Sequence, residues 1–252
     1  MKKAIALILL LSASTSFADD KPVHVFIFSG QSNMASMDPK TGFVPEAKAL
    51  FGIEEVVYIK VAKGGQPICR WVKEWTDIAK EKGLSSRHID RILKGEGTKY
   101  YQPILDQYQA LLEKHPKPTS VTFCWMQGER DANGGVDAAY KDALKLLIAK
   151  LRRDLERPDM NIVIGRIGDY ALDRPSCVAV RKAQREIVNE DPRGAWVDVD
   201  DLNNKEVKGK MQSVVHYTKE GYKILGQRFA RQGYALVTGR EPAEDGRPKG
   251  VE

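Results

Sequence analysis

Short apolar runs recur along the chain, and helix-length segments with a polar face separate them. Nearly continuous Val, Ile and Phe residues in such runs predict strands that are covered on both faces. The expected strands are 23–28, 56–61, 120–125, 162–167 and 196–199.

Between these runs, apolar residues repeat at intervals of three and four, which is the period of an amphipathic helix. The expected helices are 101–112, 136–155, 181–188 and 219–236. The alternation of strand and helix predicts an α/β fold with one mainly parallel sheet and helices on both faces. In such folds the functional groups lie on loops beyond the carboxyl ends of the strands.

Two polar stretches interrupt this order, residues 64–98 and residues 201–213. They lack an apolar period, so we expect long loops, which are often functional in folds of this kind. Residues 240–252 contain Pro, Gly and charged residues with almost no apolar content, and predict a frayed polar tail. The remainder, residues 19–239, has the length of one domain.

The first eighteen residues predict a bacterial-type signal peptide. Lys2 and Lys3 precede an apolar run at 4–11, and Ser16-Phe17-Ala18 provides small residues for cleavage. We therefore expect a secreted or periplasmic protein. No other stretch approaches the ~20 apolar residues that a membrane helix needs, so no membrane span is expected.

Charge and cysteine content exclude several classes of function. The net charge of +6 falls to +4 when the two lysines of the signal peptide are removed, and the basic residues are scattered among acidic ones. Without a basic stripe we expect no nucleic-acid partner. The three cysteines, Cys69, Cys124 and Cys177, are too widely spaced for a zinc site, and no metal is expected. Cys124 lies in an apolar run and is expected in the core.

The first candidate for chemistry is Ser32, which follows Gly30-Gln31 where the first strand is expected to turn into a helix. A serine at such a turn places its hydroxyl at the carboxyl edge of the sheet and its N–H where negative charge is favoured. Both properties suit a nucleophile. The alternative is an ordinary helix-capping serine.

Two further strand ends carry candidate groups. Gly64-Gly65 permits a close backbone approach, and Gly65 is the candidate N–H donor to an oxyanion; a tight turn is the alternative. After the third strand, Gln127 can donate its side-chain amide. Glu129 and Arg130 can bind substrate hydroxyls, or form a salt bridge.

His216 lies directly before the last amphipathic helix, and the other three histidines have no such setting. His24 alternates within the first strand, His88 lies in a charged loop and His115 ends a helix. We therefore expect structural roles for these three and a chemical role for His216.

Four motifs follow one another along the chain. They are Gly-Gln-Ser-Asn-Met at 30–34, Gly-Gly-x-x-Ile at 64–68, Trp-x-Gln-Gly-Glu-x-Asp-Ala at 125–132, and His-x-Thr-x-x-Gly-Tyr at 216–222. In this order the chain resembles the SGNH-hydrolase superfamily, and within it the sialate O-acetylesterase and acetylxylan esterase group of carbohydrate esterases. The resemblance runs from about residue 23 to residue 230.

The resemblance implies a flavodoxin-like three-layer α/β/α sandwich, with Ser32 as nucleophile and His216 as base. It implies an oxyanion hole made from the N–H groups of Ser32 and Gly65 and the side chain of Gln127. No metal and no organic cofactor is implied. The candidate substrate-binding residues around these groups are Gln31, Asn33, Glu129 and Arg130.

At one position the chain departs from the family pattern. The family usually carries an aspartate three residues before the histidine, and here that residue is Ser213. Loss of the acid from a serine protease triad costs on the order of 10⁴ in turnover. Asp200, Asp201 or Glu129 is a substitute, or a backbone carbonyl orients the histidine, or the enzyme is weak or inactive.

These residues predict a serine esterase that removes O-acetyl groups from carbohydrate through an acyl-enzyme. The rival prediction is a catalytically weak or inactive carbohydrate-binding protein on the same fold, because of Ser213. An esterase for longer, apolar acyl chains is less favoured, since Trp71, Trp75 and Trp125 near the motif loops are the kind of flat faces on which sugar rings stack. Packing in the core or in the loops is the alternative for each of the three.

Overall fold

The computed structural model of the protein describes residues 22–240. The expected signal peptide, and residues 241–252 of the expected tail, lie outside this range. Five strands pair in parallel into one sheet of order β2-β1-β3-β4-β5. The strands are β1 (His24–Gly30), β2 (Val57–Ala62), β3 (Ser120–Met126), β4 (Asn161–Gly165) and β5 (Gly194–Val197).

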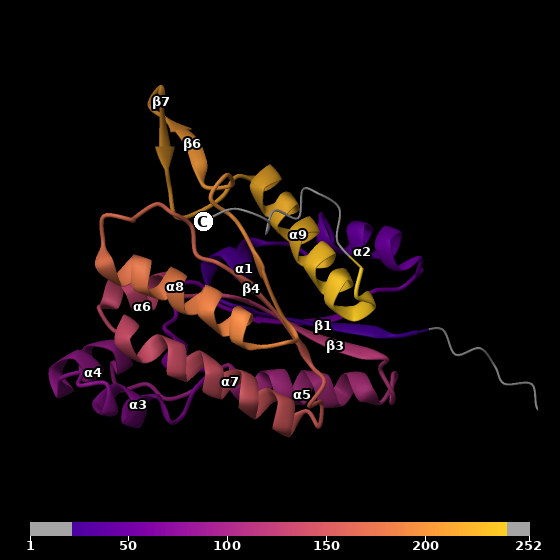
Figure 1. Ribbon diagram of the computed structural model, residues 1–252, viewed down its shortest axis with the longest axis horizontal. Coiled ribbons are helices and arrows are strands. Elements are labelled where there is room, and N and C mark those ends of the chain that lie inside the picture. The colour runs from indigo at the N-terminus through magenta and orange to yellow at the C-terminus, as the bar shows by residue number, and fades with distance from the viewer. Residues whose placement is uncertain (1–21, 241–252) are drawn as a thin grey trace, which may run out of the picture.

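Helices connect the strands. They are α1 (Ser32–Ser36), α2 (Phe43–Phe51), α3 (Trp75–Glu81), α4 (Ser86–Leu93), α5 (Tyr101–Leu112), α6 (Glu129–Gly134), α7 (Tyr140–Asp154), α8 (Pro175–Glu190) and α9 (Lys219–Thr238), with short 3-10 turns η1 (Ile68–Arg70) and η2 (Asp137–Ala139). An antiparallel hairpin of β6 (Asn204–Val207) and β7 (Lys210–Ser213) precedes α9 and stands clear of the sheet (Figure 1).

Side chains of β1 alternate between two apolar cores, one on each face of the sheet. Val25 and Ile27 pack in the core that includes residues of α5, α7 and α8. Phe26 and Phe28 pack in the other core, with residues of α2 and α9. Figure 1 shows α9 and α2 on one side of the sheet and α5, α7 and α8 on the other. The predicted three-layer α/β/α architecture is therefore confirmed.

The five predicted strands and the four predicted helices are all present, and 101–112 matches α5 at both ends. The prediction of a long loop at 64–98 is wrong, because this stretch contains α3 and α4. Each of these helices buries only two side chains, so the apolar period is too short to recognise among lysines and glycines. The second polar stretch contains the hairpin, whose strand β7 is exposed along its whole length.

All three cysteines are buried and unpaired. Cys124 lies in β3 with no exposed surface, as its apolar surroundings predicted. Burial raises the pKa of the Cys69 thiol to about 12. Within the described residues 22–240, no helix is long and apolar enough to cross a membrane.

Candidate active site

The carboxyl ends of the five strands lie at one edge of the sheet, because all five strands are parallel. Hydrogen bonds join the loops at this edge. The N–H of Gln31 donates to the carbonyl of Met126 (2.9 Å), and the N–H of Lys63 donates to the carbonyl of Gly30 (3.1 Å). The segments after β1 and β2 are thus held to the carboxyl ends of the neighbouring strands, although Gln31 and Met126 are 95 residues apart in the sequence.

Gly30 ends β1 in a conformation that only glycine adopts easily, with φ of +143°. A Cβ at this position would lie 2.0 Å from the carbonyl oxygen of Met126, which is a backbone atom of the neighbouring strand. The chain then turns into α1, whose first residue is the half-buried Ser32. The predicted turn from strand to helix at Ser32 is confirmed.

Gly64 is the residue of the second motif that lies against Ser32. A Cβ placed on Gly64 would be in van der Waals contact with the Ser32 Cβ, at 3.6 Å. The candidate donor Gly65 is exposed, has φ of +70°, and has no atom within 4 Å of its virtual Cβ. The glycine pair therefore forms an open turn beside the serine.

Gln127 is fully buried, and three acceptors surround its Nε2. These are the carboxylate of Asp131, the carbonyl of Gln66 (3.1 Å) and Oε1 of Gln31 (3.3 Å). The amide thus joins the loops after β1, β2 and β3. An NH₂ group has only two hydrogens to donate, and these three acceptors already occupy them. The role of Gln127 in an oxyanion hole therefore stays a prediction.

Asn33 connects the segment after β1 with the segment around the start of α9. Its Nδ2 donates to Oε1 of Glu129 (2.9 Å) and to the carbonyl of Val215 (3.0 Å), and its Oδ1 accepts from the hydroxyl of Tyr222 (3.1 Å). The neighbour of Ser32 is therefore bonded directly to the neighbour of His216. Gln31 and Asn33, expected to bind substrate, are both buried and hydrogen-bonded within the protein.

His216 itself is exposed. Within residues 22–240 its imidazole makes no hydrogen bond, so Ser32 and His216 lie on adjoining segments without a bond between them. The other histidines lie elsewhere: His24, at the opposite end of β1, is buried and bonded to the hydroxyl of Ser120 (2.8 Å). Burial lowers the pKa of His24.

Glu129 is a buried carboxyl group beside this junction, with 2% of its surface exposed. Burial raises its pKa to about 7, although the bonds from its own backbone N–H and from Asn33 oppose the rise. Its second oxygen, Oε2, has no hydrogen-bond partner in the described part of the chain. The salt bridge to Arg130 that the sequence left open is not formed. Arg130 is half-buried, and its backbone N–H donates to Oε1 of Gln31 (3.2 Å).

Asp131 is the second buried carboxyl group of this loop, and the sequence did not assign it a role. It accepts from Gln127 and from the N–H of Ile68 (3.0 Å), and burial raises its pKa to about 7. Asp131 therefore ties the third motif to the segment after β2. No group of three or more His, Cys, Asp or Glu side chains within residues 22–240 has the geometry of a metal site.

Ser213, which replaces the usual aspartate, belongs to a polar cluster at the base of the hairpin. Its hydroxyl donates to Oδ1 of Asp169 (3.0 Å). The Nδ2 of Asn203 donates to the same carboxylate oxygen (2.8 Å) and to the Ser213 hydroxyl (3.0 Å). Asp169 was missed in the sequence, although its position just beyond the fourth strand is the signal that pointed to Ser32 and Gln127.

The two aspartates considered as substitutes for the acid are paired with arginines. The Asp200 carboxylate contacts Arg166 and Arg181, both at 2.7 Å. Asp201 contacts Arg228 at 2.7 Å. Both carboxylates thus form ion pairs with arginines, and these pairs hold the segment after β5 in place.

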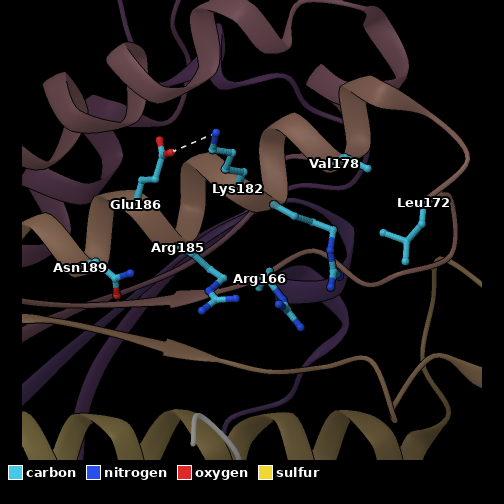
Figure 2. Close-up of a pocket in the computed structure, with 8 residues that line it drawn as sticks. Arg166, Leu172, Val178, Lys182, Arg185, Glu186 and Asn189 are labelled. Carbon is cyan, nitrogen blue, oxygen red and sulfur yellow. Dashed lines mark ion pairs between the residues drawn. The ribbon is translucent and has the colours of Figure 1, made fainter. Parts of the chain in front are cut away.

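Arg166 also lies beside a hollow that is lined by residues of α8 and of the segment between β4 and α8. Figure 2 shows Arg166 and Arg185 pointing into the same space. Their guanidinium groups lie over the ring of Trp196, 4.6 and 5.3 Å from its centroid. Lys182 and Glu186 of α8 are paired at 3.7 Å on the rim. Four of the eight residues that line this hollow are cationic.

Of the two roles expected for Trp71, Trp75 and Trp125, the structure shows packing in the core and not faces open to sugar rings. All three are at most 1% exposed. Trp71 donates from Nε1 to the hydroxyl of Ser29 (2.8 Å) and packs edge-on against Trp125 at 5.1 Å. They form core under the motif loops, because so large an apolar surface is most stable out of water.

The parallel sheet, its strand order and the polar loops at its carboxyl edge define the class: an SGNH-type hydrolase fold. A family model described as carbohydrate esterase, sialic acid-specific acetylesterase, matches residues 35–235, which is more than half of the chain. The chain belongs to this family and is a carboxylic ester hydrolase. The matched segment includes Gly65, Gln127 and His216 and begins three residues after Ser32.

Solved structures with the same fold share little sequence with this chain. A carbohydrate acetylesterase from Xanthomonas citri has a TM-score of 0.61 at 16% identity, over 86% of this chain and 57% of that longer chain. NanS has a TM-score of 0.59 at 14% identity, over 87% and 98%. A protein from Arabidopsis thaliana has a TM-score of 0.55 at 19% identity, over 84% and 98%. No curated protein matches the chain.

Proposed function

We propose that the protein is a serine esterase that removes O-acetyl groups from carbohydrate, with Ser32 as nucleophile and His216 as general base. The observation that carries the proposal is the hydrogen bond from Asn33 to the carbonyl of Val215, which joins the neighbours of the two residues. The family match and the carbohydrate acetylesterase among the structural relatives support a sugar ester as substrate.

In the first half of the reaction, His216 takes the proton of the Ser32 hydroxyl as its oxygen attacks the acetyl carbonyl. Negative charge develops on the former carbonyl oxygen, and the N–H groups of Ser32 and Gly65 are the candidate donors to it. Gln127 becomes a third donor if the substrate oxygen displaces the carbonyl of Gln66, which lies 3.1 Å from Nε2. The sugar hydroxyl leaves with the proton from His216.

In the second half, water attacks the acetyl group on Ser32. His216 accepts a proton from the water and then returns it to the serine oxygen as acetate leaves. The reaction thus consumes one water and releases one acetic acid for each ester bond, and the enzyme returns to its starting state.

Gln31 and Asn33 have positioning roles in this proposal, because their side chains are bonded inside the protein. Arg130 is the candidate that retains access to substrate, since it is half-buried and makes no ion pair within the described residues. Glu129 supports the site from within through Asn33.

The second candidate function is a carbohydrate-binding protein with weak or no catalysis. It is favoured by the serine at position 213 and by the absence of a hydrogen bond to the His216 imidazole in residues 22–240. Retention on an acetylated glycan, without acetate release above buffer from the natural protein, supports this candidate over the esterase.

The nucleophile is tested with Ser32→Ala, measured on a chromogenic acetate ester and on a panel of acetylated glycans. We expect kcat/KM to fall by about 10⁴-fold or to the buffer rate, because the acyl-enzyme can no longer form. Ser86→Ala, on the exposed surface of α4, is the matched control and keeps full activity. A folded Ser32→Ala protein with unchanged activity contradicts the proposal.

A further inference from the structure

Three residues before His216, the family pattern has a negative charge and this chain has a hydroxyl. Ser213 cannot ionise, so it cannot balance an imidazolium ion. Its hydroxyl, however, donates to a carboxylate that comes from another loop, at 3.0 Å. That carboxylate belongs to Asp169, four residues beyond the end of β4.

We propose that Asp169 supplies the acid of the catalytic triad, with Ser213 and Asn203 holding its carboxylate at the place that the family's aspartate takes. The inference rests on the proposed function, since it assigns a partner to His216. Asp169 is a positioning residue in this scheme: it fixes the imidazole and stabilises its charged form, and it touches no substrate.

The hydrogen bonds of Asp169 leave one oxygen available. Both the Ser213 hydroxyl and the Asn203 amide donate to Oδ1. Within residues 22–240, Oδ2 accepts no hydrogen bond. A carboxylate held rigidly through one oxygen can accept the imidazole N–H with the other, which is the arrangement that a triad acid requires.

The path from this cluster to His216 is short. Ser213 and His216 are three residues apart, so their Cα atoms are separated by at most about 11 Å. Val215, between them, is tied to Asn33 beside the nucleophile. The loop after β4 and the loop before α9 therefore meet at the same edge of the sheet as Ser32.

The other nearby carboxylates are less suited to the task. Asp200 is shared by two arginines and Asp201 is paired with a third, so their charges are already balanced. Glu129 is buried, its Oε1 accepts from Asn33, and burial raises its pKa to about 7, which favours the neutral acid over the carboxylate. Asp169, by contrast, is half-buried and contacts only neutral donors in the described part of the chain.

During turnover the proposed contact moves no additional proton. Nδ1–H of His216 donates to the Asp169 carboxylate, while Nε2 takes the proton of Ser32. The carboxylate thereby selects the tautomer that leaves Nε2 free as a base.

The kinetic test is an exchange of the two side chains. We expect Asp169→Asn to lower kcat by about 10²- to 10⁴-fold with KM nearly unchanged. Adding Ser213→Asp to that variant restores the charge at the family position, and we expect at least tenfold recovery. Asp173→Asn, an exposed aspartate in the same loop, is the control and keeps full activity. Activity of folded Asp169→Asn within threefold of the natural protein, or no recovery in the double variant, overturns the proposal.

A spectroscopic test does not depend on turnover or on the Asn variant folding. Long-range ¹H–¹⁵N spectra of the natural protein near neutral pH report which nitrogen of neutral His216 carries the proton. We expect it on Nδ1, and a proton on Nε2 alone overturns the proposal. If the natural protein shows the Nδ1 tautomer but hydrolyses no ester, the proposed function fails and the Asp169 contact stands.

Discussion

Gly30 of the first motif and Gly128 of the third motif occupy positions where the structure leaves no room for a side chain. The virtual Cβ of Gly30 would lie 2.0 Å from a backbone oxygen, and that of Gly128 would lie 2.7 Å from Cγ1 of Val180. Both residues also have large positive φ, +143° and +150°. Each glycine lets a strand end pass close to a neighbour and sends the next residues, Gln31 and Glu129, into the buried junction.

Glu129 makes the stability of the protein depend on pH. Its folded-state pKa of about 7 lies above its ordinary value of 4.5, so the unfolded chain loses this proton first as pH rises. The stabilisation is complete below pH 4.5 and is lost as pH rises through 7. The unfolding free energy of the natural protein should therefore fall between pH 4.5 and pH 7.5. We expect this fall to be smaller in Glu129→Gln by on the order of 3 kcal/mol, because glutamine has no proton to lose.

Urea unfolding at several pH values measures the effect. Glu113→Gln is the control, because Glu113 is exposed at the end of α5 and the substitution removes the same charge. The pKa of Asp131 is raised in the same way, but Asp131 is present in all of the proteins compared, so its effect cancels in the difference between them. Parallel pH curves for the natural protein and Glu129→Gln contradict the expectation.

At the scale of a single element, the start of α9 shows how the fourth motif positions His216. Thr218 caps the helix, because its hydroxyl accepts from the N–H of Gly221 at 3.0 Å. A Cβ on Gly221 would lie 2.9 Å from Cβ of Tyr217, so a larger residue would push that side chain away. The spacing His-x-Thr-x-x-Gly therefore sets His216 two residues ahead of a rigid helix end.

Removal of this cap is expected to destabilise the protein. Thr218→Ala leaves the Gly221 N–H without its acceptor and should lower the unfolding free energy by about 1 kcal/mol. Thr218→Ser retains the hydroxyl and should recover most of the loss. Denaturant midpoints of the three proteins give the answer, and equal losses in the Ala and Ser variants would argue against capping.

The elements that could be predicted from sequence are those with a long apolar period. The helix α7 buries six side chains along fifteen residues, and its pattern is unmistakable. The hairpin could not be predicted, since β7 is exposed on both faces and its pairing with β6 comes from backbone hydrogen bonds, which leave no apolar pattern. For α1, five residues are too few to display a period.

At the scale of the molecule, the sheet divides the apolar residues into two cores, and α9 is the main cover of one. Phe229 of α9 has no exposed surface and packs edge-on against Phe28 of β1, with ring centroids 6.4 Å apart. We expect Phe229→Ala to cost about 3–5 kcal/mol, because it removes a large buried ring and leaves a cavity.

Equilibrium unfolding in denaturant tests this expectation. Leu172→Ala is the comparison, since Leu172 is 52% exposed and its truncation should change stability by no more than about 0.5 kcal/mol. Similar losses in the two variants would show that α9 does not close the core as described.

The candidate site could be predicted from sequence only at positions that a local pattern marks. Ser32, Gly65, Gln127 and His216 are each within a few residues of a strand end or helix start, and such positions can be recognised from local pattern. Asp169 could not be connected to His216, because its link runs through Ser213, 44 residues further along the chain. The burial of Trp71 was equally hidden, since a large aromatic residue near a polar loop suits both core and surface.

The position of β1 has a consequence for synthesis of the protein. This first strand lies between β2 and β3, all seven of its residues are buried, and its partner β3 begins 96 residues later. A ribosome therefore releases β1 long before its second neighbour exists. Until then the nascent chain carries an apolar segment with one open hydrogen-bonding edge, the combination that makes incomplete polypeptides aggregate and recruits chaperones.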